Sequence, residues 1–492
     1  MIFDITAAYW QEALAVAAYV VWAVGATLIL LLERRSPTTT LAWLLALLFL
    51  PYVGAIIYFF FGPRRLRRKR LRYAKSRSAV AGKAPAMLAR PANLSEDIFL
   101  RYRQLARLLE RLDQPPPART TALRIYSEGD AFYADMLAAI AAAKHHLHLE
   151  YYIWRADHIG TRIRDALVER ARAGVQVRLL VDSVGSSGTR DAFFAPLVEA
   201  GGEVAWFNRL HLGKLRLRYF NFRTHRKILV ADGCVAFTGG MNITDDHASA
   251  GSGNPGSGSH ARSGGGWRDT HLRFEGAPAA QLQRVFLDDW MFAHRECEVL
   301  PQFFPECAPG EGPFVQVVSS GPDQDTWAIQ RLLFNAIANA RSSIRLTTPY
   351  FVPDEPMLAA LVAAALRGVS VRVLLPAKCD SFLVTAAARS YYEELARLGV
   401  EIWEYGPQML HAKTAVFDDI VSVIGTANFD NRSFRLNFEV VAVVYAADIA
   451  KRMNVLFDAD IVSAVRYATP ARKLPVHERL VMGAARLFSP LL

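Results

Sequence analysis

One eighteen-residue pattern occurs twice in this chain, and it constrains the fold more than any other feature. Residues 225–242 read HRKILVADGCVAFTGGMN, and residues 411–428 read HAKTAVFDDIVSVIGTAN. Both copies contain a histidine, a lysine two residues later, an aspartate five residues after that, and a glycine and an asparagine at matching distances. The segments upstream also match, since residues 173–180 read AGVQVRLL and residues 367–374 read RGVSVRVL. The chain therefore contains a duplicated domain rather than a short solenoid repeat.

The sequence around each copy predicts an α/β fold. The residues after Lys227 are apolar and β-branched, which is typical of a buried strand. Successive side chains of a strand alternate, so His225 and Lys227 are expected on the same side. From Thr121 onward, helical and strand patterns alternate along the chain. We therefore expect two tandem α/β domains, at residues 121–308 and 309–492, related by a pseudo-twofold axis.

The paired histidines indicate the chemistry. A neutral imidazole is a good nucleophile and a protonated one is a good acid, so His225 and His411 can divide these tasks once they are brought together. Lys227 and Lys413 supply positive charge to the phosphoryl oxygens as negative charge moves onto them. These residue types predict phosphodiester transfer through a phosphohistidine intermediate. Since the lysines do the work of a metal ion, and no group of residues has the sequence spacing of metal ligands, we expect no metal and no other cofactor.

Polar residues late in each copy are expected to contact the substrate. Asn242 and Asn428 end the two copies and are candidates for holding the phosphoryl oxygens. Thr426 occupies the place of Gly240 in the other copy, and its hydroxyl is a further candidate for binding the phosphate. The two halves of the site are therefore expected to be chemically unequal.

Four acidic residues belong to the candidate catalytic set. Asp232 and Asp418 complete the doubled pattern, but each ends an apolar strand, so we interpret them as supports rather than reacting groups. A nucleophilic imidazole needs an acceptor for its second N–H, which fixes the tautomer and stabilises positive charge. Glu439 in the second half, and Asp269 in the corresponding place of the first half, are predicted to be these acceptors.

The N-terminal part of the chain is expected to lie in a membrane. Residues 13–32 form an uncharged apolar run that is long enough to cross a bilayer as a helix, and a second apolar run covers residues 40–62. The first run is too long for the apolar part of a signal peptide and lacks a basic N-terminal flank. We therefore predict a transmembrane hairpin of two helices over residues 1–62.

A basic segment follows, within a juxtamembrane linker and helix predicted for residues 63–120. Residues 64–77 carry nine lysines and arginines and no acid, out of a net charge of +11 for the whole chain. The positive-inside rule places this end of the hairpin, and the domains that follow it, in the cytoplasm. The same charges attract anionic membrane lipid. Because little net charge remains elsewhere, no nucleic-acid partner is expected.

These features resemble the phospholipase D superfamily, in which the pattern H-x-K-x4-D occurs twice. Further segments resemble its membrane-anchored bacterial cardiolipin synthases: ERRSP at 33–37, WRD at 267–269, NFDNRS at 428–433 and SPLL at 489–492. The resemblance implies two phospholipase D-like domains and a multi-pass protein of the bacterial cytoplasmic membrane. The implied reaction joins two phosphatidylglycerols and releases glycerol, without a nucleotide. It also implies His225 as the nucleophile and His411 as the acid, an order that the residues themselves leave open.

Other functions stay open on the same residues. Water as the acceptor gives a phospholipase D-type hydrolase, and phosphatidylserine synthesis or nuclease action can use the same scaffold. The hairpin disfavours a nuclease, and two intact patterns disfavour a membrane scaffold with an inactive enzyme domain. The choice of acceptor depends on how the assembled pocket excludes water, which is not a property of the sequence.

Three remaining features lie outside the doubled pattern. The four cysteines include no C-x-x-C pair, which favours a reducing compartment and disfavours a cysteine zinc site. Residues 249–266 form a Gly/Ser-rich insert, expected to be a surface loop, with a mobile lid over the site as the alternative. Residues 479–488 form an amphipathic tail, expected to pack on the second domain.

Overall fold

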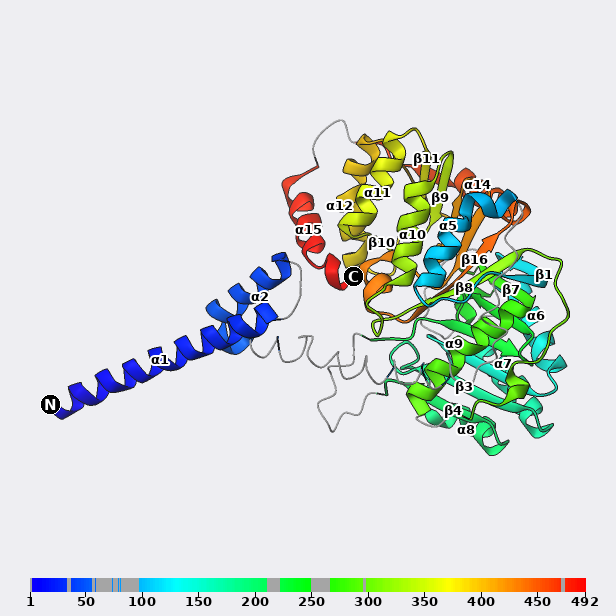
Figure 1. The fold of residues 1–492 in the computed structure, drawn as a ribbon, viewed down its shortest axis with the longest axis horizontal. Coiled ribbons are helices and arrows are strands. Elements are labelled where there is room, and N and C mark those ends of the chain that lie inside the picture. Colours follow the sequence, from blue (N-terminus) through cyan, green and yellow to red (C-terminus); the bar gives the residue numbers. More distant parts are fainter. Residues whose placement is uncertain are drawn as a thin grey trace. The chain divides into compact units, whose positions relative to one another are not determined.

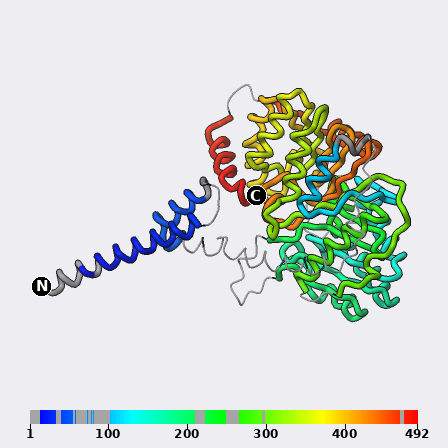
Figure 2. Tube along the Cα trace, viewed as in Figure 1, coloured from blue at the N-terminus to red at the C-terminus, as the bar shows by residue number. Residues whose placement is uncertain are grey.

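The computed structural model describes residues 2–32, 37–54, 58, 73, 78, 80, 97–209, 222–248, 266–294, 298–469 and 474–492. They belong to two compact units, Met1–Lys69 with His211–Arg218, and Arg70–Leu210 with Tyr219–Leu492. Figure 1 labels the helices and strands, and Figure 2 traces the same chain from one terminus to the other. The basic segment 64–77, apart from Tyr73, and the insert 249–266, apart from Gly266, lie outside the described residues.

The N-terminal unit contains two apolar helices, α1 (Ile2–Leu32) and α2 (Pro37–Phe49). Among the described residues, Ala13–Leu32 is the one helical segment long and apolar enough to cross a membrane. α2 has only 13 residues, and Pro51, which lacks the N–H of a helical hydrogen bond, follows shortly after its end. The structure thus shows one of the two predicted spans, and the second apolar run is interrupted near Pro51.

The two N-terminal helices contact each other along one face. Leu30 and Leu47 are buried in this contact, and the Tyr19 hydroxyl donates to the Leu48 carbonyl at 2.7 Å. Most of the apolar side chains of the Ala13–Leu32 span are exposed instead. Burial of apolar surface is worth about 25 cal/mol per Å², so this helix suits an apolar environment better than water.

The second unit is built on one sheet of fifteen strands, to which both halves of the chain contribute matching sets. The strand order is β17-β12-β11-β9-β13-β14-β16-β8-β1-β7-β6-β5-β2-β3-β4. Outward from the centre, β1-β7-β6-β5-β2-β3-β4 in the first half corresponds to β8-β16-β14-β13-β9-β11-β12 in the second. The halves join where β1 pairs antiparallel with β8, with Arg119 opposite Phe314. The α/β prediction is confirmed, and the doubled sequence gives a doubled sheet.

In both halves, helices alternate with strands in the same order. The first half consists of β1 (Ala118–Tyr126), α6 (Gly129–Ala142), β2 (His146–Tyr151), α7 (His158–Arg172), β3 (Gln176–Asp182), α8 (Asp191–Glu199), β4 (Glu203–Phe207), β5 (Lys227–Ala231), β6 (Val235–Gly239), η4 (Asp245–His247), β7 (His271–Gly276), α9 (Ala277–His294) and η5 (Pro301–Phe303). The second half consists of β8 (Phe314–Ser320), α10 (Ala328–Asn339), β9 (Ser343–Thr347), β10 (Phe351–Val352), α11 (Glu355–Leu366), β11 (Ser370–Pro376), α12 (Phe382–Arg397), β12 (Glu401–Tyr405), β13 (Thr414–Phe417), β14 (Val421–Gly425), β15 (Phe429–Asp430), α13 (Asn431–Arg435), β16 (Glu439–Tyr445), α14 (Ala447–Val462), β17 (Ala464–Arg466), α15 (Val476–Leu487) and η6 (Ser489–Leu491).

Helices cover both faces of this sheet, and the strands are apolar on both sides as a result. On one face, α9 and α14 contribute to one apolar cluster with the strands, which includes Phe286 and Met453. On the other face, α6, α7 and α8 cover the first half, and α10, α11 and α12 cover the second. The helix α5 (Asp97–Arg111) precedes the first half in sequence, yet Leu105 packs it into the core of the second.

The C-terminal helix α15 packs on the second domain, as predicted, but its apolar side is not the side that is buried. It lies against α12, but within α15 only Ala485 is buried. Leu480 and Leu487 are 68% and 81% exposed. The tail was expected to bury its apolar side on the domain, whereas the structure leaves most of that side uncovered.

The cysteines also differ from their prediction. Cys234, in the turn between β5 and β6, forms a disulfide with Cys307, 73 residues away. Cysteine spacing alone favoured reduced thiols, because the pair is brought together only when η5 passes beside the β5–β6 turn. Among the described residues, Cys379 is the free cysteine.

Candidate active site

The two motif histidines lie just before equivalent strands, and each contacts the opposite half of the chain. His225 precedes β5, and its backbone N–H donates to the Phe438 carbonyl at 2.9 Å. His411 precedes β13, and its backbone N–H donates to the Arg268 carbonyl at 2.7 Å. Each histidine is thus fixed by backbone hydrogen bonds to the opposite half, and both are buried, with 8% and 5% exposure. Both motifs therefore meet in one site.

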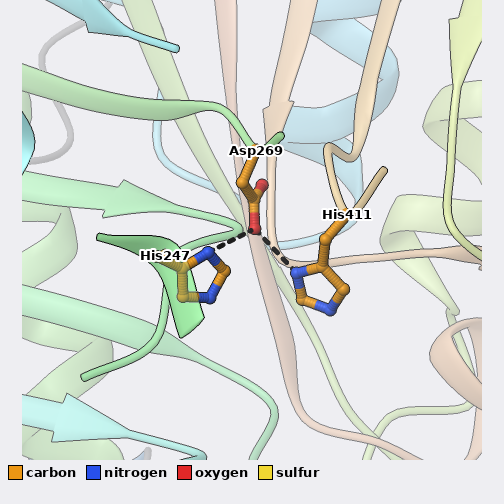
Figure 3. A group of neighbouring side chains, drawn as sticks. All are labelled: His247, Asp269 and His411. Atoms are coloured by element: carbon orange, nitrogen blue, oxygen red, sulfur yellow. Dashed lines mark hydrogen bonds and ion pairs between the residues drawn. The ribbon is translucent and has the colours of Figure 1, made fainter. Parts of the chain in front are cut away.

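Each histidine ring takes its carboxylate partner from the other half of the chain. His225 Nδ1 lies 3.0 Å from both carboxylate oxygens of Glu439, and His411 Nδ1 lies 2.7 Å from Asp269 Oδ2. Figure 3 shows the second of these pairs. The sequence singled out both acids as imidazole acceptors by their places within their own halves. It gave no signal of the exchange, which results from the backbone bridges beside the two histidines.

Each motif lysine hydrogen-bonds to the backbone carbonyl of its own motif histidine. Lys227 Nζ donates to the His225 carbonyl at 2.8 Å, and Lys413 Nζ donates to the His411 carbonyl. Burial, and then the positive charge of Lys413, lower the pKa of Lys227 to about 7. Burial lowers the pKa of Lys413 to about 8. Burial thus disfavours the charged form of both lysines in the free protein, and a bound anion would stabilise that charged form.

Burial also controls the state of the histidines. It lowers the pKa of His225 to about 4, although Glu439 opposes the shift. Burial, followed by the charges of Lys413 and Lys227, lowers the pKa of His411 well below its ordinary value. At neutral pH both free imidazoles are therefore uncharged, and an uncharged imidazole with its Nδ1 proton held by a carboxylate presents Nε2 as a nucleophile or base.

Glu439 is surrounded by hydrogen-bond donors. Besides His225, it accepts from the hydroxyls of Thr426 at 2.5 Å and Ser433 at 3.0 Å, and from Asn437 Nδ2 at 3.2 Å. Burial raises the pKa of Glu439, but His225 and the other partners outweigh it and the pKa is lowered overall. Thr426 was expected to offer its hydroxyl to the phosphate. The structure instead directs that hydroxyl at the carboxylate.

Asp269 has a sparser environment. Its Oδ1 accepts from the Thr270 N–H at 2.7 Å, and its Oδ2 accepts from His411. Gly240 stands where the other half has Thr426, and a Cβ at Gly240 would overlap the Asp269 carboxylate. The inequality between Gly240 and Thr426 is thus real, but it concerns the carboxylates rather than the substrate.

The motif asparagines are buried beside the site. Asn242 Oδ1 accepts from the Ile153 N–H at 3.2 Å, which fixes the orientation of the amide. Asn428 donates its backbone N–H to the Ser433 hydroxyl at 3.1 Å, which links it to the group around Glu439. Their exposures are 1% and 4%, so each is held in place by its surroundings.

The motif aspartates lie at the far ends of the same strands. Asp232 follows β5 and accepts from the backbone N–H groups of Lys144, His145 and His146 at 2.7–2.9 Å. Asp418 follows β13 and accepts from the backbone N–H groups of residues 341–343. Both have left-handed backbone, with φ of 50° and 53°. Their hydrogen bonds hold the loops before β2 and β9 in place, at the strand ends away from the histidines. This position fits a supporting role.

Three site residues lacked a clear sequence signal. The ring of Tyr152 lies 5.0 Å from that of His225, and the ring of Trp267 lies 5.2 Å from that of His411. His247, at the end of η4, is fully buried beside Asp269 and His411, and ligand atoms of the three residues lie within 4.8 Å of one another. The sequence was expected to contain no metal-ligand group. The group of His247, Asp269 and His411 was not predicted because its members come from separate segments. Of the three additional site residues, only Trp267 could have been inferred, from its neighbour Asp269.

Comparisons with known proteins agree on one family. Residues 136–251 and 333–461 match the family described as "Cardiolipin synthase, PLD-like domain", and residues 17–63 match the family "Phospholipase_D-nuclease N-terminal". The chain is 35% identical to cardiolipin synthase 1 of Bacillus cereus over 485 residues, which cover 95% of this chain and 92% of that protein. It is also 35% identical to the major cardiolipin synthase ClsA of Bacillus subtilis over 476 residues, with 95% and 96% covered.

A solved structure resembles the fold. The phosphatidylserine synthase of Haemophilus influenzae matches with a TM-score of 0.58 and 13% identity, covering 79% of this chain and 100% of that one. At this identity the likeness concerns the fold alone.

Proposed function

Because this chain belongs to the cardiolipin synthase family of the phospholipase D superfamily, we propose that it converts two phosphatidylglycerols into cardiolipin and glycerol. The observation that carries the mechanism is the reciprocal pairing of His225 with Glu439 and His411 with Asp269. This pairing gives one buried site two oriented imidazoles, as a two-step transfer requires.

In the first step, His225 Nε2 attacks the phosphorus of one phosphatidylglycerol. A P–N bond forms, the P–O bond to glycerol breaks, and protonated His411 gives its proton to the departing glycerol oxygen. The phosphorylated ring of His225 becomes positively charged. Glu439 is suited to stabilise that charge, because its donors keep the carboxylate ionised. The proposed nucleophile is thus the histidine whose carboxylate partner accepts more hydrogen bonds.

In the second step, the hydroxyl of a second phosphatidylglycerol attacks the same phosphorus. His411, now neutral, takes the hydroxyl proton, and the P–N bond breaks to free His225. Lys227 and Lys413, with Asn242 and Asn428, hold the phosphoryl oxygens in both steps. Bound phosphate favours the charged forms of the lysines and of His411, which burial disfavours in the free protein.

The lipid substrate requires access to a membrane. We assign Ala13–Leu32 as a membrane span, and the apolar run after Pro37 as the second helix of a hairpin. The basic residues of 64–77 would then lie in the cytoplasm beside anionic lipid. The exposed apolar side of α15 offers the catalytic unit a further contact with the bilayer surface.

The cysteine pair tests this orientation. A disulfide such as Cys234–Cys307 is typical of oxidising compartments, whereas the proposed orientation has the same residues in the cytoplasm. We therefore expect alkylation of intact cells before lysis to trap both thiols in the reduced state. A disulfide already present in cells would instead place the catalytic unit outside the cytoplasm.

The reaction is tested with purified protein and vesicles of labelled phosphatidylglycerol. Cardiolipin and free glycerol in equal amounts are expected. Phosphatidic acid as the main product would identify water as the acceptor and a phospholipase D-type hydrolase. Adding phosphatidylethanolamine, or serine with a cytidine-linked lipid, tests the other phosphatidyltransferases that share this site chemistry.

A further inference from the structure

We propose that His247, Asp269 and His411 form a binding site for a divalent transition-metal ion such as Zn²⁺, and that the bound ion blocks the transfer reaction. His411 Nδ1 lies 2.7 Å and His247 Nδ1 lies 3.8 Å from the same oxygen, Asp269 Oδ2. Figure 3 shows both rings turned toward that carboxylate from opposite sides. Two imidazoles and one carboxylate around a common point are a ligand set that zinc ions commonly bind.

His247 is the residue that points to a ligand. It is 2% exposed, and among the described residues neither of its ring nitrogens has a hydrogen-bond partner. A buried polar group without a partner is destabilising, so a bound ligand that takes up the lone pair of the His247 ring would relieve that cost. The proposed reaction gives it no role, because Asp269 already serves His411.

The donor set selects the kind of ion. Mg²⁺ and Ca²⁺ prefer oxygen ligands, whereas imidazole nitrogens suit Zn²⁺, Co²⁺ and related ions. Ligand atoms of a tetrahedral zinc site lie about 3.3 Å apart, given bonds of about 2.0–2.1 Å. The two spacings to Asp269 Oδ2, 2.7 and 3.8 Å, bracket this value. All three ligand atoms lie within 4.8 Å of one another, so movement of the two imidazole rings toward each other would complete the site.

Binding changes His411 in a defined way. The ion takes the place of the proton that His411 Nδ1 shares with Asp269, and the neutral ring then carries its single proton on Nε2. Because Nε2 is already protonated, His411 can no longer accept a proton from the attacking hydroxyl. Asp269 is occupied at the same time. The ion therefore removes one of the two oriented imidazoles, while His225 and Glu439 are unaffected.

The first test measures binding alone, so it does not depend on the proposed reaction. Metal-stripped full-length protein in detergent is titrated with Zn²⁺ by calorimetry, and with Co²⁺ by its visible absorption. We expect one ion per chain in the wild type, and no comparable binding of Mg²⁺. His247→Leu should weaken Zn²⁺ binding by about 100-fold or more, since even outer-shell changes cost about 10–100-fold.

His271→Leu is the matched control. His271 is also fully buried, has unpartnered ring nitrogens among the described residues, and lies two positions from Asp269, but it is not part of the group. It should leave Zn²⁺ affinity unchanged. If His247→Leu does not fold, Asp269→Asn tests the same site by binding. No Zn²⁺ binding to the wild type, or equal affinity in wild type and ligand variants, or equal loss in His271→Leu, would overturn the proposal.

The second test measures inhibition. Zn²⁺ should reduce cardiolipin formation by the wild type, and EDTA should restore it. His247→Leu should lose its sensitivity to Zn²⁺, measured as the ratio of its activity with Zn²⁺ to its own activity without Zn²⁺. Binding without inhibition would refute the regulatory part of the proposal, and inhibition that persists in His247→Leu would place the inhibitory ion elsewhere.

Discussion

The two half-sites share a plan and differ in how their carboxylates are held. Glu439 accepts three hydrogen bonds from Thr426, Ser433 and Asn437 in addition to its histidine, whereas Asp269 accepts one from its own neighbour. The difference begins at one position, where the second half has Thr426 and the first has Gly240. Duplication thus preserved the reacting groups, while the groups that tune them diverged. The proposed nucleophile and the proposed acid need different pKa values, and the unequal surroundings of Glu439 and Asp269 are suited to supply them.

Removing each histidine should separate the two roles most strongly. Both His225→Ala and His411→Ala should lower cardiolipin formation by at least about 10⁴-fold. With a substrate whose leaving group is acidic, His411→Ala should still form the covalent intermediate, because no proton donor is then needed, and His225→Ala should not. Phosphohistidine trapping and peptide mapping give the result. A phosphoryl group found on His411 in the wild type would reverse the assignment.

Exchanging the carboxylates for amides should show the next largest effect. Glu439→Gln should lower turnover by up to about 10⁴-fold, as a misoriented histidine does in a comparable triad. Asp269→Asn should lower turnover less, by about 10²–10³-fold. Asp269 accepts fewer hydrogen bonds than Glu439, so fewer donors lose their acceptor when an amide replaces the carboxylate. Thermal unfolding and membrane association serve as controls. Equal losses would mean that the donors around Glu439 do not distinguish the half-sites.

The two lysines predict the pH dependence. A lysine loses its charge as pH rises through its pKa, so kcat/KM should fall above about pH 7, where free Lys227 deprotonates. The fall should steepen above about pH 8, the pKa of Lys413. Initial rates in buffers of matched ionic strength measure this. A profile that stays flat well above the higher pKa would show that neither lysine charge limits the reaction.

A smaller effect is expected at Thr426. Thr426→Val keeps the shape of the side chain and removes one donor to Glu439, which is worth about 1 kcal/mol, or roughly a five-fold loss in kcat. KM for phosphatidylglycerol should change little, because the hydroxyl faces the carboxylate. A rise in KM without a change in kcat would indicate that the Thr426 hydroxyl binds the substrate instead.

The smallest expected effect is that of chelation. Both half-sites use lysines for positive charge, so activity should survive EDTA in metal-free buffer. Complete loss of activity, restored by one specific divalent ion, would contradict the metal-free mechanism for both halves.

The sequence predicted the parts of the site better than their connections. The doubled pattern located His225, His411 and both lysines. The carboxylates were located by corresponding places after the two copies, with Asp269 displaced by the Gly/Ser-rich insert. The exchange of carboxylates between halves was not predictable, because it depends on bridges between residues far apart in sequence, such as Thr224 and Phe438. His247 and the Cys234–Cys307 pair were missed for the same reason. The Thr426 hydroxyl can donate to Glu439 or to a bound phosphate, and sequence spacing alone does not show which acceptor lies nearer.

The symmetric join of β1 with β8 has a consequence for ancestry. Each histidine takes its carboxylate from the opposite copy, so an ancestor with a single copy could complete this site only as a symmetric dimer. Fusion of two such genes made the association independent of protein concentration. It also released the copies from the requirement to be identical, since a change such as glycine to threonine would then affect one half-site rather than both.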